Sequence, residues 1–151
     1  MRRPKHGQSR PEDHDSPWKG ALVVFFKPFM DFLYPHISTL IDWQQPVEFL
    51  DKELQKITSK AKNPRRYADK LVKVQFLNDS EKWILIHIEV QGALETDFAE
   101  RMFFSYYRIR DRYQKPVISL AVLTDTQPSF RPNHYSHEIA GCSIRFQFET
   151  V

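Results

Sequence analysis

The feature that most constrains the fold is a pair of alternating segments separated by a turn-forming cluster. Residues 67–77 read YADKLVKVQFL and residues 83–91 read WILIHIEVQ, and both alternate with the period of two that is typical of β-strands. The cluster NDSEK between them, residues 78–82, favours a turn. The second segment is apolar on both faces until its end, which indicates a central strand. The sequence therefore predicts a β-hairpin at the centre of a sheet.

Polar side chains gather at the end of the second predicted strand. Glu89 and Gln91 are two residues apart, so they point to the same face of the sheet. Asp69 joins that face if the numbers of paired residues have an even sum, and a sum of about 160 places Asp69 opposite Gln91 with Glu89 as the diagonal neighbour. An odd sum would turn Asp69 to the other face. His87 shares the face of Glu89, where a buried hydrogen-bonding histidine is more usual than a metal ligand.

Two carboxylates at this distance suggest a metal site. Opposite residues of an antiparallel pair have Cβ atoms roughly 5 Å apart, and diagonal residues roughly 7 Å apart. At that separation Asp69 and Glu89 can hold one hard cation between them. Oxygen ligands suit Mg²⁺ or Mn²⁺ rather than Zn²⁺.

An apolar segment near the N-terminus predicts a divided helix. Ser16 is a typical N-cap residue, and Pro17 suits the first helical turn because its missing N–H group is not needed there. Apolar residues crowd residues 18–33, and Pro28 should kink or divide this helix. The next proline, Pro35, should end it. Because the segment is apolar on most sides, we expect it to be buried.

A second helical pattern follows the hairpin. Residues 97–115 carry an apolar stripe at helical spacing, which consists of Phe98, Met102, Tyr106, Ile109 and Tyr113. Residues 117–125 and 143–151 have the patterns of strands, with a loop between them. A short amphipathic helix is plausible near residues 49–57. This order predicts an α/β fold with a mixed central sheet flanked by helices.

Length and composition fit one domain. The chain has 151 residues, of which 41% are hydrophobic, and its net charge of +3 suits a polyanionic partner without singling one out. The single Cys142 excludes an internal disulfide framework. No signal-peptide pattern is present, and the longest apolar run, residues 21–26, is too short to span a membrane. We therefore expect a cytoplasmic protein with a disordered basic tail over residues 1–13 and one domain over residues 14–151.

The hairpin and its polar end resemble the PD-(D/E)XK nuclease superfamily, which places an Asp at the start of one strand and (D/E)-X-K near the end of the next. More narrowly, the chain looks like the bacterial family of recombination-promoting nucleases and transposase-like proteins. The stretches that carry this likeness are HDSPWK, RYADKLVKV, ILIHIEVQG and FAERMFFSYYRI. The likeness covers residues 14–151. Since that family commonly runs on beyond this length, a C-terminal portion is expected to be missing.

The resemblance implies a restriction-endonuclease-like core of αβββαβ type. Asp69 and Glu89 would be metal ligands, and Gln91 would be the third catalytic residue, in the place of the superfamily lysine. A neutral amide can position water or a phosphate oxygen, but it carries no positive charge. Auxiliary candidates near the site are His14, Asp15 and Asp31. Candidates for contact with DNA are Lys19, Arg65, Arg66, Arg101 and Arg108.

These patterns favour a Mg²⁺- or Mn²⁺-dependent DNA endonuclease of a transposase-like, recombination-promoting type. The alternative is a catalytically impaired remnant that acts as a DNA-binding or protein-interaction module. A small-molecule α/β enzyme is less favoured, because the chain has only 4 Gly and no glycine-rich phosphate loop. DNA is the expected partner, no membrane partner is expected, and self-association into a homo-oligomer stays open.

Overall fold

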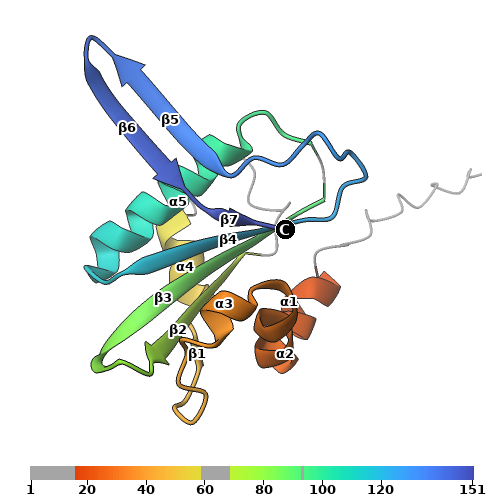
Figure 1. Cartoon of the computed structure of the whole chain (residues 1–151), viewed down its shortest axis with the longest axis vertical. Coiled ribbons are helices and arrows are strands. Elements are labelled where there is room, and N and C mark those ends of the chain that lie inside the picture. The colour runs from red at the N-terminus through yellow and green to blue at the C-terminus, as the bar shows by residue number, and fades with distance from the viewer. Residues whose placement is uncertain (1–15, 59–68, 93) are drawn as a thin grey trace, which may run out of the picture.

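A five-stranded mixed sheet lies between two layers of helices, and a separate two-stranded hairpin projects from this body (Figure 1). The computed structural model describes residues 16–58, 69–92 and 94–151. The elements are α1 (Ser16–Val24), α2 (Phe26–Leu33), α3 (Pro35–Ser38), β1 (Glu48–Phe49), α4 (Asp51–Thr58), β2 (Lys70–Phe76), β3 (Asp79–Gln91), α5 (Phe98–Tyr113), β4 (Val117–Leu123), β5 (His134–Ile139), β6 (Cys142–Gln147) and β7 (Glu149–Thr150). The strand order of the sheet is β1-β2-β3-β4-β7. The mixed α/β architecture with flanking helices is therefore confirmed.

The predicted hairpin is formed by β2 and β3, and its register has the even parity that the site requires. Lys70 pairs with Ile88, so paired residue numbers sum to 158 over most of the hairpin. Extending this register by one residue places Asp69 level with Glu89, where a sum of 160 had placed it level with Gln91. The turn lies at Leu77-Asn78, and the register shifts just before it, between Gln75 and Phe76. There the sum of paired residue numbers changes from 158 to 155, a shift of three residues, whereas the even sum holds for every pair from Lys70 to Gln75.

Each face of the sheet is covered by its own helices. On one face, Val72, Ile86 and Ile88 belong to a buried cluster with apolar residues of α1, α2 and α3. On the other face, Leu71 and Leu85 pack with residues of α4 and α5. Because β3 lies inside the sheet and is covered on both sides, its residues 85–91 are all buried. The polar end of β3 therefore lies under helices rather than at a solvent-exposed edge.

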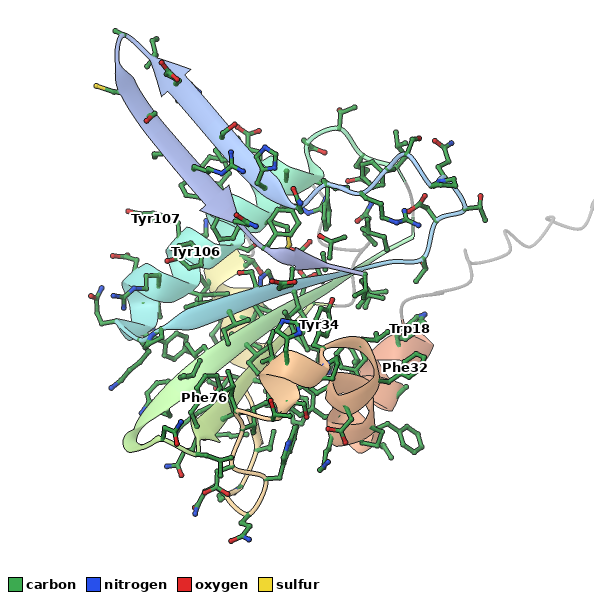
Figure 2. The ribbon with its side chains drawn as sticks, viewed as in Figure 1. Trp18, Phe32, Tyr34, Phe76, Tyr106 and Tyr107 are labelled. Atoms are coloured by element: carbon green, nitrogen blue, oxygen red, sulfur yellow. The ribbon has the colours of Figure 1, made fainter. Side chains whose placement is uncertain are left out.

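The N-terminal helix is divided, as predicted, and the break falls at Phe25. Pro28 lies four residues after Val24, so its ring would collide with the Val24 carbonyl group in a continuous helix. The expectation that this segment is buried on most sides is wrong. Trp18 and Phe32 are exposed and lie on the helical layer in Figure 2, and only one side of the two helices meets the core.

The segment predicted as one strand over residues 143–151 is split in two. Residues up to Gln147 form β6, which pairs with β5 in the projecting hairpin, although the stretch that contains β5 was expected to be a loop. After Phe148 the chain forms β7, which pairs in parallel with β4. Phe148 is 4% exposed and packs against Phe98 of α5. The burial of this one side chain accompanies the change of the chain from one sheet to the other.

Helix α5 covers the sheet face that carries the polar end of β3. The predicted stripe is observed, since Phe98, Met102 and Ile109 are fully buried. At 16 residues, α5 is the longest helix among those described. Within the described residues, no helix is long and apolar enough to cross a membrane.

Candidate metal site

Three potential metal ligands converge beneath helix α5. Asp69 directly precedes β2, and His87 and Glu89 lie two residues apart on β3. Each offers one donor atom, and these atoms all lie within 4.8 Å of one another. The Nε2 atom of His87 is 3.5 Å from the Oε1 atom of Glu89. The predicted approach of Asp69 to Glu89 is therefore confirmed, and His87 joins them.

The cluster is deeply set in the protein. His87, Glu89 and Gln91 are at most 1% exposed, whereas Asp69 is half-buried. Such burial follows from the position of β3 between β2 and β4, with α5 above it. Taking a carboxylate out of water is costly unless charged groups or hydrogen-bond donors compensate it. The neighbours of Glu89 must therefore supply that compensation.

Arg101 of α5 compensates the charge of Glu89. Its Nη2 atom lies 3.2 Å from Oε2 of Glu89 and its Nε atom 3.4 Å from the same oxygen. The same Nη2 group donates to Oε1 of Gln91 at 2.9 Å, and Nη1 donates to Glu95 at 2.7 Å. One guanidinium therefore ties the buried carboxylate, the amide and a second carboxylate into one network. Arg101 remains 20% exposed, so the network reaches the surface.

The two oxygens of Glu89 face different neighbours. Oε2 accepts from Arg101, whereas Oε1 faces Nε2 of His87 and accepts a long hydrogen bond of 3.4 Å from Ser105. The side of the carboxylate toward His87 is thus distinct from the side that the guanidinium occupies.

His87 is a neutral imidazole in this environment. Burial lowers its pKa below the ordinary value of 6.5, the Glu89 carboxylate opposes this shift, and the Arg101 guanidinium adds to it. Neither ring nitrogen has a hydrogen-bond partner among the described residues. The neighbouring residue on β4 is Ser119, whose buried hydroxyl also lacks a partner within that part of the chain. Two adjacent polar groups therefore have unused hydrogen-bonding capacity.

The donor set fits a divalent cation. Ligand atoms lie about 2.0–2.2 Å from such ions, so two ligands on opposite sides of one ion are about 4.2 Å apart. The 4.8 Å within which the donor atoms of Asp69, His87 and Glu89 lie is close to this span. Two carboxylates and one imidazole are also ligand types that divalent metals use.

The other predicted residues lie in different places. Asp31 is not brought to the cluster: it is on α2, where it binds Lys27 and Ser38, and α2 covers the opposite face of the sheet. Lys19 belongs to α1, on that same face. Arg108 is half-buried on α5, seven residues after Arg101 and so on nearly the same side of the helix. Four candidates lie outside the described residues, namely His14, Asp15, Arg65 and Arg66.

The structure adds residues that the sequence analysis did not place in the site. Arg101 was expected to contact DNA, and its bonds to Glu89 and Gln91 were not foreseen. Ser105 and Glu95 were not considered. Ser105 could have been noticed, because it interrupts the apolar stripe at the helical position between Met102 and Ile109 and is 5% exposed. Glu95 precedes α5 and has no comparable signal in the sequence.

No family model matches the chain, and no curated protein or solved structure matches it either. The features that point to a function are therefore the geometry and chemistry of the cluster of Asp69, His87 and Glu89.

Proposed function

We propose that the protein is a metal-dependent DNA endonuclease in which Asp69 and Glu89 hold Mg²⁺ or Mn²⁺. The observation that carries the proposal is the convergence of these carboxylates at one end of the central hairpin. When bound, such an ion lowers the pKa of a water ligand and offsets the charge that develops on a phosphodiester. The residues of the chain then have to bind and orient the DNA strand.

Arg101 supplies the positive charge that Gln91 lacks. Its guanidinium donates to the Gln91 side-chain oxygen and is partly exposed, whereas the amide itself is buried. Arginine binds phosphate oxygens well, because its planar group donates two parallel hydrogen bonds. In this proposal Arg101 contacts the scissile phosphate, and its hydrogen bond to Gln91 keeps that amide oriented.

The order of elements supports a restriction-endonuclease-like core. Helices come first, followed by the short β1, helix α4, the β2–β3 hairpin, α5 and then β4, which pairs in parallel with β3. Apart from α4, which lies between β1 and β2, this order agrees with the αβββαβ arrangement implied by the motifs in residues 14–151. We propose a cytoplasmic enzyme of a recombination-promoting type that acts on DNA through its backbone, since phosphate contacts carry no base information.

A plasmid-nicking assay tests the proposal. With Mg²⁺ or Mn²⁺ we expect conversion of supercoiled to relaxed plasmid, and we expect EDTA to abolish it. Asp69→Asn and Glu89→Gln should each lower the rate at least about 100-fold, because either change removes a ligand charge. Asp31→Asn is the matched control, since Asp31 lies on the opposite side of the sheet and should leave the rate unchanged. Nicking that survives both ligand substitutions would rule the proposal out.

A second function, DNA or protein binding without cleavage, is favoured by one observation. Arg101 already occupies Oε2 of Glu89 and the oxygen of Gln91, so part of the polar face is engaged within the protein. The same variants distinguish the two functions. DNA binding that weakens steeply with salt and is never followed by cleavage would favour the binding module.

A further inference from the structure

We infer that His87 is a third ligand of this site, and that the site therefore selects a divalent transition-metal ion such as Mn²⁺ over Mg²⁺. The inference rests on the metal-binding part of the proposed function and does not depend on cleavage of DNA.

The first argument is the burial of His87. The side chain is 0% exposed, and neither ring nitrogen has a hydrogen-bond partner among the described residues. Buried polar groups in folded proteins nearly always have a partner, and an exception calls for an explanation such as an ion. An apolar residue would fill this interior position without burying two nitrogens that make no hydrogen bond with the described residues. A ligand role accounts for a histidine here.

The imidazole ring of His87 is also directed toward the two carboxylates. The Nε2 atom lies 3.5 Å from Oε1 of Glu89, the oxygen on the side away from the Arg101 contact. Neighbouring ligands of one ion are about 3 Å apart when each lies about 2.0–2.2 Å from it. The donor of Asp69 is within 4.8 Å of both. Three donors, two from β3 and one from the residue before β2, thus lie at nearly the separation that a shared ion requires.

The third argument is the charge of the site. Asp69 and Glu89 bring two carboxylates, and Arg101 donates to Glu89 at Oε2. A cation bound between Oε1 and His87 therefore does not need to displace the guanidinium.

Ligand chemistry then decides which ion is preferred. Mg²⁺ prefers oxygen ligands and retains much of its water, whereas imidazole nitrogen is a favourable ligand for first-row transition metals. Mn²⁺ accepts carboxylates as readily as Mg²⁺ does. A site with two carboxylates and one imidazole should therefore bind Mn²⁺ more tightly than Mg²⁺.

The test measures metal binding directly. The whole chain, freed of metal with EDTA and dialysed, is titrated with Mn²⁺ while free aqueous Mn²⁺ is followed by its paramagnetic resonance signal. Mg²⁺ affinity is measured by competition. We expect Mn²⁺ to bind at least about tenfold more tightly than Mg²⁺. His87→Gln should weaken Mn²⁺ binding about 10- to 100-fold and Mg²⁺ binding much less. The matched control is His137→Gln, an exposed histidine of the projecting hairpin, which should change neither.

A spectroscopic measurement on the unmodified sequence covers the case in which His87→Gln fails to fold. Electron spin-echo spectroscopy of bound Mn²⁺ should show coupling to a ¹⁴N nucleus, replaced by a ¹⁵N coupling when the protein is labelled with ¹⁵N-histidine. The chain has 6 histidines, so the signal is assigned to His87 when it is retained in the Gln variants of the other five, which are His6, His14, His36, His134 and His137.

The outcomes separate the inference from the proposed function. Mn²⁺ that binds without nitrogen coupling, and as tightly in His87→Gln as in the parent protein, overturns the inference and leaves the carboxylate site intact. An absence of Mn²⁺ and Mg²⁺ binding overturns both. Mn²⁺ binding that depends on His87 without any nicking of plasmid supports the inference and overturns the nuclease function.

Discussion

At the scale of residues, Glu89 shows how the burial of a carboxylate is compensated by a side chain from another element. Its burial follows from its place on a central strand, and its partner is the guanidinium of Arg101 on α5, 12 residues further along the chain. Removing one member of a buried ion pair costs more than forming it gains, because the remaining charge loses both water and partner. Arg101 therefore has a structural role in addition to any contact with DNA.

Arg101→Met tests this structural role. Without metal, we expect the variant to lose about 3 kcal/mol of unfolding free energy, because Glu89 is left buried without its guanidinium. Urea unfolding in EDTA measures this loss, and Arg110→Met, an exposed position on the same helix, is the control.

Metal should then stabilise Arg101→Met more than it stabilises the parent protein, since the ion takes over part of the lost charge compensation. An equal stabilisation of both proteins by Mn²⁺ would contradict the view that Arg101 and the ion act on the same carboxylate.

At the scale of elements, the layer of α1, α2 and α3 is joined to the sheet by one buried hydrogen bond as well as by apolar contacts. The Tyr34 hydroxyl donates to the Ala121 carbonyl oxygen of β4 at 2.8 Å. In Figure 2, Tyr34 lies between the helical layer and the sheet. Burial, with a smaller contribution from the Glu149 carboxylate, raises the pKa of this phenol well above its ordinary value of 10. The protonated form is therefore strongly favoured in the folded state.

Tyr34→Phe should reveal this shift through the pH dependence of stability. At neutral pH the variant should be less stable by about 1 kcal/mol, because the hydrogen bond is lost. Above pH 10 the unfolded chain releases the phenolic proton while the folded protein retains it, so the parent loses stability as pH rises. The gap between parent and variant should shrink from pH 10 upward.

Urea unfolding between pH 8 and pH 11 measures this gap. Tyr107→Phe is the control, since Tyr107 is 56% exposed and its removal should have little effect on stability at any pH. A gap between Tyr34→Phe and the parent that stays constant up to pH 11 would show that the phenol titrates normally in the folded protein.

At the scale of the whole molecule, β7 forms one edge of the central sheet, next to β4. The backbone N–H group of Val151 donates to the Ala121 carbonyl group, and that of Leu123 donates to the Val151 carbonyl group. Phe148, between the projecting hairpin and β7, packs against Phe98 and Phe146. This aromatic cluster packs α5 against β4 and against the chain segment that leads into β7.

Phe148→Ala should therefore destabilise the fold by about 3–5 kcal/mol, the usual loss for a buried phenylalanine. Phe32→Ala is the matched control, because Phe32 is 83% exposed and its loss should cost less than about 0.5 kcal/mol. Chemical denaturation of both variants provides the comparison. Equal losses in the two variants would mean that Phe148 is not a core residue.

Local patterns were enough to predict several elements. The period of two in residues 67–77 and 83–91 predicted the hairpin, and the spacing of Phe98, Met102 and Ile109 predicted α5. Residues 143–151 were mispredicted as one strand, because alternation is the same for a strand in either sheet. Only long-range packing around Phe148 decides where the chain changes sheets.

In the candidate site too, some relations between residues follow from the sequence and others only from the tertiary structure. Since side chains on a strand alternate, the sequence by itself determined that Glu89, Gln91 and His87 share a face. The tertiary structure decided that Asp69 lies level with Glu89, because the turn falls at Leu77-Asn78 with a shift of three residues beside it, which gives the rest of the hairpin a sum of 158. It also decided that Arg101 meets Glu89. That contact depends on how α5 packs across the sheet, which no local spacing encodes.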